Sequence, residues 1–299
     1  MSTAYILIKR NTKLFFKDKG LFFVSLITPM ILLILYVTFL GNVYRDSFLM
    51  TVPQGFSIDE RLIDGFVASQ LISSILAVSC VTVAFCSNML MVQDKANGSI
   101  KDLTISPVKS STLAISYYVS NLISTLIICF SALVLCLIYV AIMGWYMTVG
   151  DVLLLALDIV LLVLFGSALS SAINFFLSSQ GQISAVGTIV SSCYGFVCGA
   201  YMPISQFSKG IQRVIMFLPG TYGTSLLRNH AMQGAFSKME AEGLPQEVII
   251  AAKDAMDLNI YFFEEKVAVW EMYLVLLGSV ACLIGAYVLL NVLKEKKRK

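Results

Sequence analysis

Residues 94–107 read DKANGSIKDLTISP and form a short charged segment between two long apolar stretches. These stretches, roughly residues 65–92 and 111–147, contain no Asp, Glu, Lys or Arg. Each is long enough to cross a bilayer as a helix, which needs about 20 apolar residues. The charged segment is therefore predicted to be a short loop between two membrane spans.

The loop itself is predicted to contain a rigid helix. Ser99 can accept a hydrogen bond from the first free backbone N–H groups, and Asp102 stands at the position of a capping-box acid. Gly98 permits a sharp entry, and Pro107 ends the helix because the residue before a proline avoids helical dihedrals. A capped helix held parallel to the bilayer by two spans could receive force from a partner outside the membrane.

The composition indicates a membrane protein. Of the 299 residues, 58% are apolar and only 13% are charged, whereas a soluble domain carries about 25% charged residues. Long unbroken apolar stretches are typical of membrane helices and differ from the alternating pattern of a barrel. We therefore expect an all-α membrane protein with six transmembrane helices, at about residues 21–41, 65–92, 111–144, 151–178, 183–200 and 268–293.

Both ends of the chain are rich in positive charge. Residues 1–19 are predicted to form an amphipathic interfacial helix in the lipid headgroup region, and its cations are Lys9, Arg10, Lys13 and Lys17. Residues 294–299 add a basic segment after the last span. Together with the whole connection between the second and third spans, residues 93–110, these parts hold 13 Lys or Arg against 4 Asp or Glu. By the positive-inside rule, both termini are expected to be cytoplasmic, in a multi-pass protein of the cell membrane.

The long connections are expected on the outer side. An outer loop is predicted over residues 42–64. Residues 201–267 are predicted to form an outer re-entrant and cap segment, because apolar residues recur at helical spacing over 204–218 and an amphipathic pattern resumes over 221–236. A further cap helix is expected to begin at Pro245. Residues 20–299 are thus interpreted as one transmembrane domain.

Few residues point to chemistry. The chain has no phosphate-binding loop motif, and its single histidine, His230, excludes a multi-histidine metal site. We expect no catalytic residue, metal or cofactor in this chain. All seven cysteines fall in predicted spans and are interpreted as packing residues. Asp158 is the one acid deep in a predicted span. It could serve proton coupling, or it could form an interhelical hydrogen bond or reach the outer interface, and we expect one of the latter two. His230 is expected to be exposed or to cap a helix.

Two predicted spans carry small polar residues. The second span is rich in serine, and the fifth is rich in glycine and serine. Such residues let helices pack closely, or they line a polar cavity. Candidate walls of a translocation path are Ser69, Gln70, Ser73, Ser191 and Gly195.

Two motifs resemble the type-2 ATP-binding-cassette (ABC) exporter permeases. The first is similar to their first cytoplasmic loop and reads Asp94-Lys95-x-x-Gly98-Ser99-x-x-x-Leu103-x-x-Ser106-Pro107. The second is similar to their fifth-span exit and re-entrant hairpin, and runs from Gly199-Ala200-Tyr201-Met202-Pro203-Ile204 through Phe217-Leu218-Pro219-x-Thr221-Tyr222 to Leu226-Leu227-Arg228. Two features depart from the family. Asp94 stands where Glu is more common, and an outer insert occupies about residues 238–266.

The resemblance implies a permease subunit that is not itself an enzyme. It would form a homo- or heterodimer with a second permease subunit in the lipid bilayer, and it would bind separate nucleotide-binding ATPase subunits that hold ATP and Mg. Residues 94–107 would form the coupling helix, contacting the ATPase through Asp94, Lys95, Gly98, Ser99, Asp102, Leu103, Ser106 and Pro107. The outer gate of the re-entrant segment would comprise Gly199, Met202, Pro203, Pro219 and Tyr222.

The implied activity is ATP-driven export of an unidentified substrate, which could be amphipathic, lipid-like, a peptide or an antibiotic. Two alternatives remain from the sequence. One is a transporter or channel that acts without ATP, and the other is a ligand-binding immunity or scaffold protein of the membrane. No nucleic-acid partner is expected.

Overall fold

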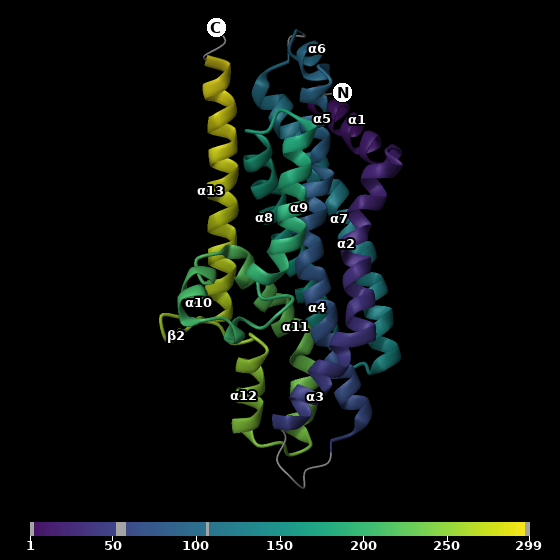
Figure 1. Cartoon of the computed structure of the whole chain (residues 1–299), viewed down its shortest axis with the longest axis vertical. Helices are drawn as coiled ribbons and strands as arrows, with labels where there is room; N and C mark the ends of the chain where they lie inside the picture. Colours follow the sequence, from purple (N-terminus) through teal and green to yellow (C-terminus); the bar gives the residue numbers. More distant parts are fainter. Residues whose placement is uncertain (1–2, 52–57, 106–107, 297–299) are drawn as a thin grey trace.

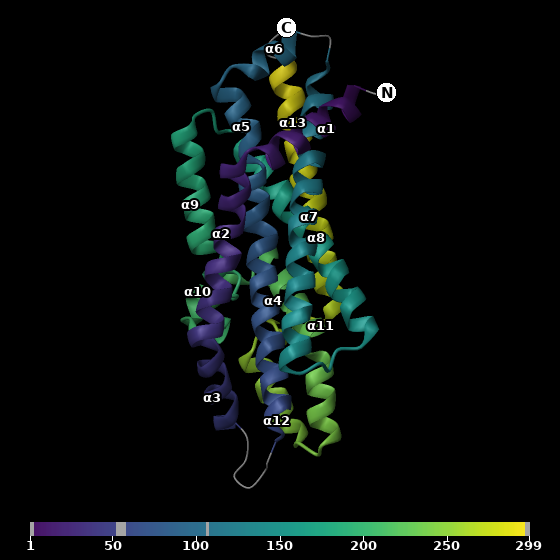
Figure 2. The same ribbon diagram turned by 90° about the vertical axis from the view of Figure 1, so that its right-hand side faces the viewer.

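A computed structural model describes residues 3–51, 58–105 and 108–296. The chain forms an elongated bundle of helices with one small β-hairpin (Figure 1). The start of α1 (Thr3–Lys17), the short helix α6 (Ser99–Ile105) and the end of α13 (Val269–Lys296) lie at one end, which we call the α6 end. Helices α3 (Gly41–Thr51) and α12 (Gln246–Ala255) lie at the opposite end, the α12 end (Figure 2).

Five helical segments are long and apolar enough to cross a membrane, and they confirm a multi-pass helical protein. The first joins α2 (Lys19–Leu35), the π-helical turn η1 (Tyr36–Leu40) and most of α3; the second joins α4 (Glu60–Ser87) and α5 (Met89–Ala96). The others are α7 (Ser110–Met143), α8 (Val149–Asn174) and most of α13. Three of these agree with predicted spans three, four and six, although α8 ends four residues before Ser178.

The predicted fifth span forms α9 (Gln180–Val197), which is not among these five segments. Its helix is only 18 residues long, and two glutamines in the first turn together with several Gly, Ser and Thr residues lower its hydropathy. Ser179 and Gln182 form the capping box that starts it. Helix α9 runs from the α6 end toward α10 (Lys209–Ile215) (Figure 2). The expectation of six spans by length and composition is thus reduced to five.

The predicted outer loop over residues 42–64 is wrong at both ends. The first helical segment continues to Thr51, and α4 already begins at Glu60. The charged residues that suggest a loop instead pair between helices, since Arg45 of α3 lies 2.6 Å from Asp64 and 3.4 Å from Glu60 of α4. Polar residues near a helix end therefore support the contact between α3 and α4.

Helix α4 is the centre of the bundle. Every residue from Gly65 to Asn88 is buried, and α2, α7, α8, α9 and α11 (Pro219–Ala241) pack around it. Small residues allow this close packing. A Cβ atom at Gly166 of α8, for example, would lie 3.0 Å from the carbonyl oxygen of Cys80.

The segment after α9 folds into short elements and one long helix. It contains the 3₁₀ turn η2 (Ile204–Gln206), α10, α11, α12 and the antiparallel strands β1 (Tyr261–Phe262) and β2 (Glu265–Lys266). The predicted helix starts are close to the observed ones. The helix expected from residue 221 begins at Pro219, and the helix expected from Pro245 begins at Gln246, with Pro245 as its N-cap. The amphipathic surface pattern expected over 221–236 is wrong. Helix α11 is buried along most of its length and packs against α4, α8 and α13.

Candidate functional site

The predicted coupling helix forms as α6, between α5 and α7 at the α6 end of the bundle (Figure 1). Gly98 precedes it with φ +81°, a left-handed conformation that favours glycine, and no atom lies within 4 Å of the place a Cβ would take. Leu103 is half-buried, whereas Ile105 is 84% exposed. Ser106 and Pro107, and the side chain of Asp102, lie outside the described residues. Ser99 is the first residue of α6.

Asp94, in α5 just before α6, binds side chains of α1 and α7. Its carboxylate is buried in the last turn of α5, and Oδ2 accepts hydrogen bonds from Arg10 Nη1 of α1 at 2.8 Å and from the Tyr117 hydroxyl of α7 at 2.5 Å. The bond to Asp94 raises the pKa of Arg10 above its ordinary value. Although its side chain is shorter than the glutamate more common in the family, Asp94 forms an ion pair with Arg10.

Lys95, the next residue of α5, binds the end of α8. Its Nζ donates to the carbonyl oxygens of Asn174 at 2.8 Å, Phe175 at 3.0 Å and Leu177 at 3.0 Å. These carbonyls stand at the end of α8, where backbone acceptors lack partners within the helix and a cation is favoured. The resemblance implies that Asp94 and Lys95 contact the ATPase, but in this structure both charged groups bind within the chain.

The cations of α1 are divided between two roles. Leu7, Asn11 and Phe15 are buried at i, i+4 spacing, and α1 packs on α7. Three lysines on other faces are exposed, namely Lys9, Lys13 and Lys17. Arg10 is instead held by Asp94. The helix is amphipathic as predicted, and part of its apolar stripe covers protein.

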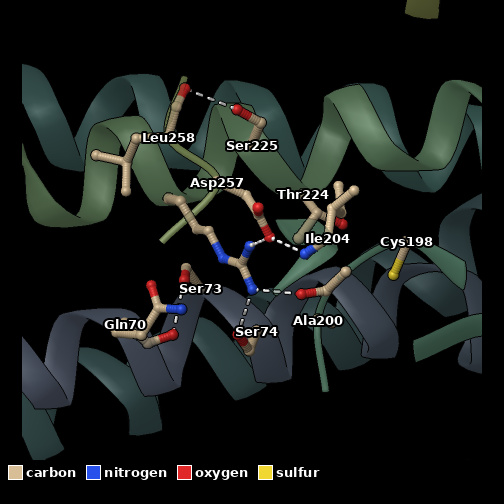
Figure 3. A network of polar contacts seen from close by, with 12 residues as sticks. Gln70, Ser73, Ser74, Cys198, Ala200, Ile204, Thr224, Ser225, Asp257 and Leu258 are labelled. Carbon is tan, nitrogen blue, oxygen red and sulfur yellow. Dashed lines mark hydrogen bonds and ion pairs between the residues drawn. The ribbon is translucent and has the colours of Figure 1, made fainter. Parts of the chain in front are cut away.

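A buried charge network includes the backbone carbonyl of Gly199, one of the predicted gate residues (Figure 3). Arg228 of α11 is fully buried, and its guanidinium donates to Asp257 Oδ2 at 2.9 Å and to the Gly199 carbonyl at 2.6 Å. A longer contact of 3.4 Å reaches Ser74 of α4. Asp257 Oδ2 also accepts from the backbone N–H of Ile204 at 2.9 Å. One ion pair thus joins α4, the end of α9, η2 and the segment after α12.

Burial controls the energetics of this network. It raises the pKa of Asp257 above its ordinary value, although Arg228 beside it acts in the opposite direction. An isolated charge at either position would cost several kcal/mol in a buried site. Sequence reasoning missed this pair. The only signal is a cation directly after Leu226 and Leu227 in α11, and nothing in the sequence identifies its partner 29 positions later.

The five predicted gate residues lie between the end of α9 and the first turns of α11. Gly199 adopts φ +76° after α9, and a Cβ there would lie 2.9 Å from Ile204 Cγ1. Pro219 occupies the first turn of α11, and the Tyr222 hydroxyl donates to the Met216 carbonyl at 2.7 Å. The remaining two are half-buried beside η2, namely Met202 and Pro203. A gating role for these residues stays a prediction.

The candidate path residues are engaged in packing. Ser69, Gln70 and Ser73 are buried within α4, and both serines donate to carbonyls of their own helix, at 2.8 Å and 2.7 Å. Gly195 leaves room for the ring of Tyr201, whose hydroxyl donates to the Ser191 carbonyl at 3.4 Å. These contacts agree with the packing interpretation, and a role in translocation stays a prediction.

Asp158 lies in a three-helix polar contact inside the bundle. Its side chain is 1% exposed, with Oδ2 2.5 Å from His230 Nδ1 of α11 and Oδ1 accepting from the Tyr273 hydroxyl of α13 at 2.7 Å. The expectation that His230 is exposed or caps a helix is wrong. Histidine at this position satisfies the buried acid, and a sequence separation of 72 residues hid the contact.

Asp158→Asn is expected to leave transport close to wild type, because an asparagine can still accept from His230 and donate to the Tyr273 hydroxyl. Asp158→Leu is expected to destabilise the chain by about 1–3 kcal/mol, because buried polar partners lose their hydrogen bonds. Transport in vesicles and thermal unfolding of the purified chain measure the two effects. Loss of transport in a stably folded Asp158→Asn variant would instead indicate that the acid takes part in proton coupling.

The fold and these sites define a polytopic helical membrane protein with the short helix α6 at one end and a buried polar network toward the other. Residues 3–231 match the model of the ABC-2 type transporter family, so the chain belongs to this family. It is an ABC transporter membrane permease that lacks the ATPase and is not itself an enzyme. A comparison with curated proteins finds no significant match.

Proposed function

We propose that this chain is the permease subunit of an ATP-driven exporter of the cytoplasmic membrane. It pairs with a second permease subunit, and two nucleotide-binding subunits dock on the α6 end. One observation carries the proposal. The base of α6 is bound to α1 and α7 through Asp94 and to α8 through Lys95.

A coupling element has to contact both the ATPase and the membrane helices, because ATP binding shifts their equilibrium only through such contacts. The partly buried residues Ile100 and Leu103 of α6 pack on a cluster that contains Met91, Leu113 and Tyr287. The cluster joins α5, α7 and α13. Ile105 at the end of α6 is exposed in this chain, and in the proposed complex it contacts a groove of the ATPase.

The direction of the helices supports six crossings and cytoplasmic termini. Helix α8 ends at the α6 end, and α13 returns to that end from the level of α10 (Figures 1 and 2). The chain therefore has to descend between them, and α9 makes that descent. The exposed lysines of α1 and the basic residues of 294–299 favour the cytoplasm for this end.

The exposed face of α9 supports a dimer and an amphipathic or lipid-like substrate. Within one chain it contacts mainly α4 and α5 and leaves Ile189 62% exposed and Phe196 49% exposed, next to the small residues Ser191 and Ser192. We propose that this face lines the path between two permease subunits, where apolar side chains with a few hydroxyls suit such a substrate.

A photo-crosslinking experiment tests the docking and the orientation together. A photoreactive residue replaces Ile105 or, as a matched control of similar exposure at the opposite side of the bundle, Val149, which is 79% exposed. In native membranes with the ATPase subunit present, we expect a permease–ATPase crosslink from position 105 and none from position 149. A crosslink from 149 alone would overturn both the coupling role and the orientation.

A further inference from the structure

A cavity of about 420 Å³ opens between α10 and the segment that follows α12. Lys209 and Arg213 of α10 form one wall, and Asp254, Tyr261, Phe263 and Glu264 contribute to the other. Most of the second wall belongs to the insert of residues 238–266, beyond the part of the chain that matches the family. The cavity is therefore a feature of this chain that the family assignment leaves unexplained.

The charges of the cavity are separated. Lys209 and Arg213 are four residues apart and lie on one face of α10, and neither forms an ion pair with a described residue. Glu264 is likewise unpaired among the described residues, at a backbone φ of +78°. Asp254 is already engaged, because its Oδ1 accepts from Asn259 at 2.7 Å and from the Tyr261 hydroxyl at 3.0 Å. Asp257 also lines the cavity, but it is paired with the buried Arg228. Of the three lining carboxylates, Glu264 therefore remains for a ligand, together with the two cations of α10.

The cavity lies at the level where a membrane span begins. The candidate span of α13 starts at Val269, three residues after β2, and Trp270 in its first turn is 63% exposed. Exposed tryptophan is typical of the membrane–water interface. Beside the cavity, Phe217 and Phe263 are 64% and 58% exposed, and their ring centroids lie 6.1 Å apart. An apolar surface next to separated charges is the pattern of a headgroup boundary.

We propose that this cavity binds the headgroup of a zwitterionic phospholipid from the leaflet at the α12 end. The phosphate lies between Lys209 and Arg213, where charge-assisted hydrogen bonds form. The ammonium group lies against Glu264 and the rings of Tyr261 and Phe263, through an ion pair and cation–π contacts. The acyl chains cover Phe217 and Val214, which is 65% exposed. The proposal requires only that the chain spans a bilayer, so it stands apart from the export function.

Native mass spectrometry of the purified full chain in detergent tests this site. The probes are phosphatidylethanolamine, phosphatidylglycerol and diacylglycerol, with inorganic phosphate as a competitor. We expect phosphatidylethanolamine to bind most tightly and inorganic phosphate to leave it bound. The Lys209→Ala/Arg213→Ala double variant should weaken its binding by about tenfold, as expected for the loss of charge-assisted contacts. Glu264→Gln should weaken the binding of phosphatidylethanolamine and leave the binding of phosphatidylglycerol unchanged.

Lys266→Ala provides the matched control, because this exposed lysine belongs to the same hairpin but does not line the cavity. It should bind all probes as the wild type does, and thermal unfolding should show that every variant is folded. If diacylglycerol bound as tightly as phosphatidylethanolamine, the surface would bind lipid through apolar contacts alone. Displacement by inorganic phosphate would make it a site for free anions. Either result, or unchanged binding in the double variant, would overturn the proposal.

Discussion

Arg228→Met is expected to destabilise the folded chain by about 3–5 kcal/mol, the usual cost of leaving one member of a buried ion pair alone. The substitution keeps much of the side-chain volume but removes the bonds to Asp257 and to the Gly199 carbonyl. Asp257 then remains a buried acid without its cation. The effect can be followed by heating the purified chain with a thiol-reactive dye in a Cys193→Ser/Cys282→Ser background, because these two thiols are exposed in the folded chain. Cys80, Cys129 and Cys198 are buried and react only on unfolding.

Two further variants separate the ion pair from packing. The double variant Arg228→Met/Asp257→Asn should recover most of the lost stability, because both buried charges are gone. Asparagine also tolerates the left-handed φ of +54° at this position. Arg45→Ala is the control, since it removes an ion pair of 2.6 Å with Asp64 whose side chains are about one-third exposed. A partly exposed pair contributes about 0–1 kcal/mol. If Arg228→Met were no less stable than Arg45→Ala, the network would have no structural role.

Gly98→Pro is expected to uncouple ATP hydrolysis from transport. Proline restricts φ to about −65° and cannot adopt the value of +81° found at Gly98, so α6 loses its orientation relative to α5. Coupling free energies of 1–3 kcal/mol correspond to effects of roughly 5- to 150-fold, and we expect transport to fall by about tenfold or more. ATPase activity and transport are measured together on the permease–ATPase complex in vesicles, and deletion of residues 99–106 should act in the same direction and also weaken subunit association.

Two glycine variants make this result specific. Gly98→Asn should retain coupling, because asparagine tolerates the left-handed region and no atom blocks its Cβ. Gly243→Pro changes a glycine of similar φ, +89°, at the α12 end and should leave the ratio of transport to ATP hydrolysis unchanged. Full transport in the Gly98→Pro variant would remove α6 as the coupling element.

The family match ends at residue 231, yet the network around Arg228 is completed by Asp257. The insert therefore supplies the acid that neutralises a buried cation of the matched region. It also supplies most of one wall of the proposed lipid site. The same segment packs against the core through Ile249, Ala252 and Met256, which are buried in the main hydrophobic cluster.

Local sequence determined the elements whose signals lie within a few turns of each other. The uncharged stretch 111–147 predicted α7, and Gly98 and Ser99 predicted the entry to α6. Hydropathy and capping depend on neighbouring residues, so a single chain carries them without knowledge of the fold. The same reasoning failed for residues 42–64, where charged residues suggested a loop but pair between α3 and α4.

Only the tertiary structure decided which polar groups meet. Asp94 contacts Arg10, which is 84 residues away in the sequence, and Asp158 contacts His230, which is 72 residues away. It likewise decided that α11 lies in the core, because its moderately polar sequence becomes buriable only once Arg228 is paired with Asp257. A buried charge is tolerated when a specific distant partner reaches it, and the identity of that partner follows from how the helices pack.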